Sequence, residues 1–488
     1  MAWQSSTINP ATTTPAADIS KITNDLQQLR GVIGGTPDVA IPSVWTTPAN
    51  VLAQTANSAT TAGTSTAYTL APAQAITSYA AGQTFWVTFH AASGANPTLQ
   101  VSGVASPPTL VRQAASGSYV NIGAGDIPAN HRSRVTLLST SQALVEEMPP
   151  RIASGLKNKI INGKMDIAQR GTSFAAASAY TLDRWELTNT SSAVATVTQQ
   201  ADAPSNNEFQ YSYRYAVTTA DTSIAAGDAL AIQQRIEGFN ARDLIGKTFT
   251  VSFWVRSSKT GTHCVAFRNS GTNRSYVVEY TISATNTWEQ KSISLPSGLI
   301  TAGTWDWTNG TGLIASWALA AGTTFQTTAG AWQTGNFLAT SNQVNCLDTV
   351  GNIFAITGVQ LEVGSFATEF DHRPFSAELA MCQRYYEQSY EPGAVGTATS
   401  VGALQNYNAS GAANTAALQV IFKVQKRATP TVTSYSTQSG AFGQIRDGSG
   451  ADRTATVQYV STSGAHITNS AVGNVANYSA QWVAAIEL

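Results

Sequence analysis

Hydrophobic and polar residues alternate along most of this chain with a period of two, which is the pattern of strands packed on one face. The pattern is clearest in residues 248–257, where Phe249, Val251, Phe253 and Val255 occupy every second position. Many such stretches follow one another without helices between them. This arrangement predicts an all-β chain built from sandwiches or jelly rolls.

Turn-forming stretches divide the pattern into three β blocks. Residues 51–150 form a small β domain that ends at Pro149–Pro150, a stiff spacer. Residues 151–390 form a large jelly-roll β-sandwich, and residues 391–488 form a C-terminal β-sandwich tip domain. The clearest expected strands are Thr84–Ala91, Thr98–Val104, Arg134–Thr140, Ser192–Gln200, Thr248–Ser257, Gly351–Gly364, Ala417–Gln425, Thr454–Thr462 and Ser479–Leu488.

Residues 1–50 carry a different pattern, that of a short coiled-coil helix. The apolar positions that define it are Ile19, Ile22, Leu26, Leu29 and Ile33. Intervals of three and four residues form a coiled-coil seam of about two heptads. The helix could instead pack on its own domain. Because so short a helix is marginal in water by itself, we favour association between chains, and we expect a trimerisation segment here.

A second helix is expected at residues 376–388, which contain neither Gly nor Pro. Ser376 can cap its N-terminus, and the negative charge of Glu378 suits its first turn. Helical spacing would place one face of this helix on the sandwich. The side chains on that face are Leu379, Cys382, Tyr385 and Tyr386.

Composition narrows the class of protein. Charged residues make up 11% of the 488 residues, and 27 Lys and Arg against 28 Asp and Glu give a net charge of −1. This balance argues against a nucleic-acid partner, which needs a basic face, and against polybasic docking on a membrane. Hydroxyl side chains must supply the polar surface, and Thr favours strands. The composition favours an exposed all-β protein over a cytosolic enzyme.

The cysteines and the N-terminal sequence indicate the cellular compartment in which the protein folds. Cys264, Cys346 and Cys382 are too sparse for a disulfide framework, and without a C-x-x-C pair no metal or cofactor site is expected. Reduced thiols suit folding in a cytoplasm. The sequence shows neither a signal peptide nor a run of about 18 apolar residues, so no membrane insertion is expected. Release of a virus particle by lysis would reconcile an outward-facing composition with the missing secretion signal.

Two stretches resemble the opening and the end of a β-sandwich module of bacteriophage tail fibre proteins. The opening is NKIINGKMDIAQRGTSF (Asn158–Phe174) followed by YTLDRWE (Tyr180–Glu186). The end is FAITGVQLEVGSFATEFDHRPFSAELAMCQRYYE (Phe354–Glu387), so the pair brackets nearly half of the chain. Residues 62–147 resemble more weakly the small β domains of such fibres.

The resemblance implies a virion tail component that is made in the host cytoplasm and recognises the host surface, usually as a homotrimer. It also implies a carbohydrate-binding type of sandwich, and attachment to phage tail or baseplate proteins through the N-terminus. The matching motifs are structural ones, so the resemblance supplies no list of binding residues.

The end motif concentrates charged residues at Glu369, Asp371, His372 and Arg373. The first three could be an acid/base set, but residues along one extended segment alternate in direction, whereas catalysis needs groups that converge in a cleft. We therefore expect a structural polar cluster at a domain junction.

Other candidate catalytic residues are equally isolated. Asp166 and Asp183 could supply the two carboxylates that glycoside hydrolysis needs, but nothing in the sequence pairs them. His263 and Cys264 could suggest a metal or thiol site. Strand alternation points them to opposite faces, so an exposed His263 and a buried Cys264 are expected. No catalytic residue is assigned, and the chain is expected not to be an enzyme.

Aromatic residues are the best candidates for contacts with a glycan, because their flat apolar faces can stack on a sugar ring. Trp305 and Trp307 lie two residues apart and share one face if the segment is extended. The loop signal TNGTG follows them, so Trp307 is the best candidate for exposure. Trp317 and Trp332 come next in the chain. For any single Trp the alternative is that it fills the sandwich core.

Host recognition is expected first in the loops of the C-terminal domain, residues 391–488, because rigid β scaffolds carry binding residues on their loops. The Trp305–Trp307 loop is the next place to look. The longest polar loop covers residues 436–453. The alternative is a solvated hairpin loop without a binding role. The candidate receptor-binding residues are Tyr407, Phe442, Arg446, Asp447, Arg453 and Tyr459.

These features predict a non-enzymatic tail fibre or receptor-binding protein that binds a host-surface glycan or other receptor during adsorption. One alternative is a tail-associated glycan depolymerase, which the lack of a converging carboxylate pair weakens. The other is a bacterial surface adhesin or carbohydrate-binding module, which the missing secretion signal weakens.

Overall fold

The computed structural model describes residues 58–73, 75–113, 119–123, 126–146, 156–175, 178–204, 208–296, 302–365, 367–407, 416–469 and 477–488. The chain forms two compact units, Met1–Pro149 and Pro150–Leu488. The expected coiled-coil seam from Ile19 to Ile33 lies outside the described residues, so the trimerisation segment stays a prediction. Among the described helices, none has both the length and the apolar character needed to cross a membrane.

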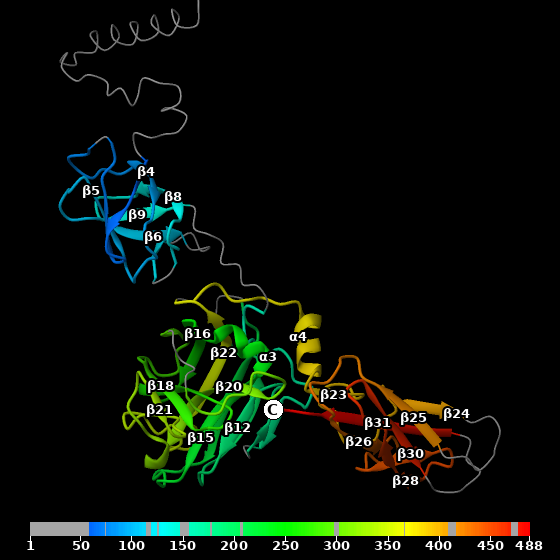
Figure 1. The fold of residues 1–488 in the computed structure, drawn as a ribbon. Helices are drawn as coiled ribbons and strands as arrows, with labels where there is room; N and C mark the ends of the chain where they lie inside the picture. The colour runs from blue at the N-terminus through cyan, green and yellow to red at the C-terminus, as the bar shows by residue number, and fades with distance from the viewer. Residues whose placement is uncertain are drawn as a thin grey trace, which may run out of the picture. The chain divides into compact units, whose positions relative to one another are not determined.

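The first unit contains one mixed β-sheet with its own apolar core (blue to cyan in Figure 1). The alternation seen in the sequence is present in β4, where Phe85 and Val87 are buried between less buried neighbours. The strands join in the order β1-β4-β8-β9-β6-β5-β3-β2, and β7 pairs with β6. Their bounds are Ser58–Thr60, Ala62–Gly63, Ala67–Leu70, Thr84–Thr88, Thr98–Val101, Thr109–Gln113, Tyr119–Asn121, Arg132–Leu137 and Gln142–Val145 for β1 to β9.

The second unit begins with the expected jelly roll, in which two antiparallel sheets enclose the main core (green in Figure 1). Phe249, Val251, Phe253 and Val255 all point into this core from one strand, which confirms their alternation. One sheet has the order β10-β13-β14-β22-β16-β19. Its bounds in that order are Ser173–Ala175, Val194–Gln200, Ser212–Thr219, Ile353–Val363, Phe249–Ser257 and Glu289–Leu295.

The other sheet of the jelly roll has the order β11-β12-β15-β20-β17-β18-β21. Its bounds in that order are Ala179–Tyr180, Glu186–Asn189, Ala229–Glu237, Thr311–Ala321, Gly261–Arg268, Arg274–Ile282 and Trp332–Thr334. Three short helical turns accompany the two sheets before the chain leaves them. These are α3 (Gly238–Ala241), η3 (Arg242–Leu244) and η4 (Thr323–Phe325).

The C-terminal domain is the expected second sandwich (orange to red in Figure 1). Its larger sheet is organised around β31, which pairs with β23, β24, β26 and β27, and β28 extends it from β27. A smaller sheet has the order β25-β30-β29. The bounds of β23 to β31 are Tyr386–Gln388, Leu404–Tyr407, Ala416–Ile421, Thr431–Ser436, Gln444–Asp447, Asp452–Thr454, Thr456–Gln458, Gly464–Asn469 and Asn477–Ala485.

The helix expected at residues 376–388 is shorter than its sequence pattern indicated. Helix α4 covers Phe375–Gln383, and its N-cap position is Pro374, not Ser376. The chain then becomes strand β23, which includes Tyr386 and pairs with the last strand of the chain. Backbone partners from about a hundred residues away therefore override a locally favourable helix. The C-terminal sheet also begins before the expected domain boundary at residue 391.

The end of the chain packs against the jelly roll. Arg184 is buried, forms an ion pair with Glu487, and lies over the ring of Tyr385 at 3.6 Å from its centroid. The hydroxyl of Tyr180 donates to the backbone oxygen of Leu488 at 2.8 Å. Although strand β22 completes its sheet, removal of residues 391–488 would leave Arg184 buried without its carboxylate. The jelly roll and the C-terminal domain are thus energetically coupled.

Candidate functional site

Trp305 and Trp307 form a stacked pair on the segment that leads into β20. Their ring planes differ by 7°, and their ring centroids are 5.2 Å apart. Parallel rings in contact lie about 3.5 Å apart, so the two rings are displaced sideways by roughly 4 Å. Each indole therefore leaves part of its face uncovered by the other. The two rings do lie together, as the sequence spacing predicts, but both are half-buried, so Trp307 is not singled out by exposure.

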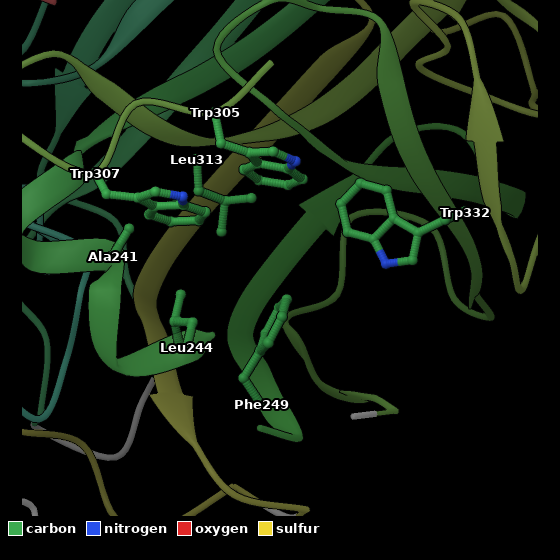
Figure 2. A pocket seen from close by; sticks show the side chains of 7 residues that line it. All are labelled: Ala241, Leu244, Phe249, Trp305, Trp307, Leu313 and Trp332. Carbon is green, nitrogen blue, oxygen red and sulfur yellow. The ribbon is translucent and has the colours of Figure 1, made fainter. Parts of the chain in front are cut away.

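The inner side of the pair borders a narrow slot on the jelly-roll core (Figure 2). Its other walls are Ala241, Leu244, Phe249, Leu313 and Trp332, which come from α3, η3, β16, β20 and β21. The ring of Trp332 meets Trp305 edge-on, with centroids 5.6 Å apart. The cavity volume is about 10 Å³, which is close to the room that one water-sized group needs.

The outer side of the pair borders a wide, open hollow of about 690 Å³. This volume falls within the range of small-molecule sites. Its rim is polar, unlike the slot, and consists of Ser270, Thr304, Asp306, Thr308 and Thr311 together with Gly271. An apolar floor with a hydroxyl-rich rim suits a ligand that has one apolar face and many hydroxyl groups.

The turn between β17 and β18 holds one end of the Trp segment. The backbone N–H of Gly271 and the hydroxyl of Ser270 both donate to the carbonyl of Thr304, at 3.1 and 2.7 Å. The N–H of Thr304 in turn donates to Asn273 Oδ1 at 3.1 Å. These bonds fix the backbone directly before Trp305.

Asp306, between the two tryptophans, holds the other end of the segment. Its Oδ1 accepts bonds from the N–H and the hydroxyl of Thr308, at 2.7 and 2.6 Å, and these bonds lower the pKa of Asp306. The turn needs glycine at two close approaches. A Cβ on Gly310 would lie 2.0 Å from Asp306 Oδ2, and one on Gly238 would lie 2.3 Å from the Asp306 carbonyl. The pair therefore stands on a rigid, anionic turn.

The C-terminal domain also contacts this turn. The guanidinium of Arg427 donates to the carbonyl of Asn309 at 2.8 Å, and the Asn309 amide donates to the carbonyl of Arg427 at 3.1 Å. Arg427 also donates to the carbonyl of Glu487 at 2.6 Å. The position of the Trp segment is thus linked to the docking of the second sandwich.

The other two tryptophans considered from sequence have different places. Trp317 is fully buried, and packs against Trp185 with ring centroids 5.7 Å apart, so it belongs to the core. Trp332 is half-buried and forms a wall of the slot. Sequence reasoning did not assign Trp332, Asp306 or Gly310 to the site. Of these three residues, only Asp306 had a signal in the sequence, which is its position between two tryptophans.

The candidate residues of the tip domain differ in their surroundings. Phe442 and Tyr459 are 74% and 77% exposed, and each meets a different aromatic partner edge-on: Tyr435 for Phe442, and His466 for Tyr459. Tyr459 has a φ of 51°, which is uncommon for a bulky residue. A role of the tip domain in recognition therefore stays a prediction, with these two exposed rings as candidates.

The charged candidates of the tip have structural partners. Asp447 is 1% exposed and accepts bonds from Ser449, Ala451 and Arg453. Arg446 pairs with strand β31 through its backbone. Tyr407 is the last residue of β24. Asp447 and Arg453 are therefore better explained as the brace of a hairpin than as ligand contacts.

The polar cluster at the end of the jelly-roll module connects the last segment of the module to its first segment. Asp371 accepts bonds from the N–H of Asn158 at 3.3 Å and from Arg373 at 3.2 Å. Arg373 also contacts Glu378. His372 has a different partner, because its Nε2 atom lies 3.8 Å from Glu208 Oε1.

The other carboxylates considered from the sequence, those of Glu369, Asp183 and Asp166, lie in different surroundings. Glu369 is exposed and contributes its carbonyl to Lys157. Asp183 is buried and bonded to Gln169, whereas Asp166 pairs with Lys164. The groups proposed as an acid/base set thus have separate structural partners.

The expectation that His263 is exposed is wrong. Both His263 and Cys264 are fully buried. Their side chains point to opposite faces of the sheet, as alternation requires, but residues 337–340 cover the outer face around Cys264. Burial lowers the pKa of His263 to about 4 and raises the pKa of Cys264. All three cysteines are free and buried. Within the described ranges, no group of three or more His, Cys, Asp or Glu side chains could hold a metal ion.

Comparisons with known proteins give distant structural likenesses. No protein-family model and no curated protein matches the chain. Over 42% of its length the chain is similar to the enzymatically active domain of tailspike protein 4 from bacteriophage CBA120, with 19% identity and a TM-score of 0.25. Over 43% it is similar to TmCBM61, solved with beta-1,4-galactotriose, with 12% identity and a TM-score of 0.23, covering 100% of that chain.

Another similar structure is the CBM22-1 xylan-binding domain of Xyn10C from Paenibacillus barcinonensis. That match covers 41% of this chain and 99% of the domain, with 11% identity and a TM-score of 0.20. The likeness to the tailspike covers only 21% of the tailspike chain. These likenesses are too distant to assign the chain to a family.

Proposed function

We propose that this chain binds a glycan in the hollow over Trp305 and Trp307, as the receptor-binding protein of a phage tail. The parallel tryptophan pair carries this proposal. Its inner side is supported by the core and its outer side borders an open hollow with a polar rim. A sugar ring has an apolar face that can stack on an indole, and hydroxyl groups that can reach the rim.

Polar groups around the pair can complete the binding. The indole N–H of Trp305 is occupied, because it donates to the carbonyl of Ala302 at 2.9 Å. Where the structure is described, the indole N–H of Trp307 has no protein acceptor, so it can donate to a sugar hydroxyl. The carboxylate of Asp306 lies on the rim and is ionised at neutral pH. Because the turn is already fixed, little ordering cost is added on binding.

The site has few charges, so electrostatic steering contributes little, and affinity per site should be modest. Several copies of the chain would then be needed for stable attachment. We propose a homotrimer joined through the N-terminal seam for this reason. Sedimentation should give a mass near three times 51.2 kDa, and replacement of Ile22 and Leu26 by Asp should reduce it. A monomer at micromolar concentration would contradict the proposal.

A glycan array with the full chain, followed by titration of the best ligand, tests the binding site. Trp305→Ala and Trp307→Ala should each weaken binding about tenfold or more, because central aromatic contacts usually dominate binding energy. Phe442→Ala and Tyr459→Ala are matched controls, since both remove an exposed ring in the tip domain. If the control changes abolish binding and the Trp changes do not, recognition belongs to the tip.

The same samples separate binding from cleavage. A reducing-sugar assay on the bound glycan should show no release of new chain ends, because we propose a protein without catalytic activity. Release of reducing ends by the full chain would support the depolymerase alternative.

A further inference from the structure

One charged side chain lies on the rim of the open hollow. Among the described residues that line the hollow, Asp306 alone is charged, and the others are Ser, Thr, Trp and Gly. Asp306 stands between the two tryptophans in the chain and is only half-buried. A ligand that stacks on the tryptophan pair therefore comes close to a carboxylate, so the charge of the ligand should affect how well it binds.

The turn fixes this carboxylate before any ligand arrives. Asp306 Oδ1 accepts the N–H and the hydroxyl of Thr308, at 2.7 and 2.6 Å. Its Oδ2 lies so close to Gly310 that a Cβ on this glycine would be 2.0 Å away. The bonds from Thr308 also lower the pKa of Asp306, so the side chain is ionised at neutral pH. The rim thus carries one negative charge at a fixed place.

The cations close to the turn are directed elsewhere. Arg427 acts on Asp306 through its charge, but its guanidinium donates to three backbone carbonyls. Arg274 donates to the hydroxyl of Thr334 on β21, at 3.0 Å. Neither arginine is among the described residues that line the hollow. An anionic group of a ligand would therefore meet the charge of Asp306 without a lining cation to pair with.

We infer that the hollow selects neutral glycans, and that Asp306 is the specificity-determining residue that disfavours sugars with carboxylate, sulfate or phosphate groups. This inference rests on the proposed glycan-binding function and names the class of ligand. An ionised carboxylate only accepts hydrogen bonds, so the hydroxyl groups of a neutral sugar can donate to it. A second anion can only be repelled.

The repulsion acts through space and does not need direct contact. For an anionic group about 7 Å from the carboxylate, with an effective dielectric constant between about 20 and 40, Coulomb's law predicts affinity about seven- to fiftyfold weaker than for the neutral sugar. Salt screens such a repulsion, because the Debye length falls from about 30 Å at 0.01 M to about 3 Å at 1 M.

Two glycans that differ in charge test the inference. The probes are the strongest neutral glycan on the array and the same glycan after oxidation of its primary hydroxyl groups to carboxylates. Calorimetric titration of the full chain in about 0.01 M salt should give binding of the oxidised form that is about sevenfold weaker or more. In about 1 M salt this difference should shrink.

Variants assign the effect to one residue. Asp306→Asn keeps an oxygen that accepts the bonds from Thr308 and removes the charge, so the low-salt difference should fall below about threefold. Thr311→Lys adds a cation on the rim without touching those bonds, and should also reduce the difference. Asp348→Asn is the matched control, because Asp348 also has a lowered pKa and accepts hydrogen bonds but is not among the lining residues. It should leave the difference unchanged, and thermal unfolding shows that each variant is folded.

Three results would overturn the inference. These are an acidic glycan as the strongest ligand on the array, equal affinity for the two probes in low salt, and a difference that neither Asp306→Asn nor Thr311→Lys reduces. If Trp305→Ala still abolished binding in any of these cases, the proposed function would stand. If the chain bound no glycan on the array, the proposed function would fail and the inference would fail with it.

Discussion

Lys426 and Glu387 form an ion pair inside the C-terminal domain, and removal of its negative partner provides a quantitative test of the structure. Both side chains are fully buried. The ammonium of Lys426 also donates to the carbonyl of Gln383 and lies 4.8 Å from the ring centroid of Phe422. Burial lowers the pKa of Lys426, and Glu387 opposes this effect. The pair joins strand β23 to the segment that follows β25.

Glu387→Gln changes the charge and keeps the shape. The remaining ammonium can lose its proton to avoid burial as a charge. With an ordinary pKa of about 10.4, that loss costs roughly 4.6 kcal/mol at pH 7 and roughly 2 kcal/mol at pH 9. Because the Gln oxygen retains some interaction, we expect the free energy of unfolding to fall by about 3 to 4 kcal/mol at pH 7.

The sign of the pH dependence follows from the protons bound. A Lys whose pKa is lowered on folding binds more protons in the unfolded state, so the stability of Glu387→Gln should rise with pH between 7 and 9. Urea unfolding, followed by hydrogen exchange in β31 peptides, measures this change. The double variant Glu387→Met with Lys426→Met should lose the pH dependence. A loss below about 1 kcal/mol, or one equal at both pH values, would refute the reasoning.

Three further changes test other local features. Gly310→Ala should weaken glycan binding at least severalfold in calorimetric titrations, because its Cβ would lie 2.0 Å from Asp306 Oδ2 and move the turn. Burial by itself would raise the pKa of Asp447, but hydrogen bonds from Ser449, Ala451 and Arg453 lower this pKa to about 2. The stability from these bonds is present above the unfolded pKa of about 4 and lost as pH falls through about 2, so Asp447→Asn should destabilise at pH 7 and hardly at pH 2 in urea unfolding. Glu487→Gln should lower the free energy of unfolding by about 2 to 4 kcal/mol in thermal unfolding, since it removes the carboxylate beside buried Arg184.

Each of these variants has a matched control in the chain. A Cβ on Gly227 would meet nothing within 4 Å, so Gly227→Ala should leave glycan binding intact. Asp166→Asn and Glu369→Gln change more exposed carboxylates and should have small effects. Normal binding by Gly310→Ala would contradict the close approach. A pH-independent effect of Asp447→Asn would contradict the prediction for that residue. An effect of Glu487→Gln no larger than that of Glu369→Gln would contradict the prediction for Glu487.

The sequence predicted the parts of the fold that depend on short-range pattern. Alternation at Phe249, Val251, Phe253 and Val255 predicted a strand whose apolar side chains lie in a core, and these four residues are buried. The run of strands without long helices also predicted two sandwiches. Such features are local, because the period of a strand places every second side chain on the same face. The same rule placed Trp305 and Trp307 together.

The features that depend on contacts between distant segments were decided only by the tertiary structure. Pairing with β31 converted Tyr386 from a helix residue to a strand residue, and covering residues buried His263 and Cys264 on both faces of their sheet. The slot consists of residues from five elements, which only the tertiary structure brings together. A sequence specifies which side chains share a face, because that depends on backbone period. It does not reveal which distant segment covers that face, because burial depends on the packing of the whole domain.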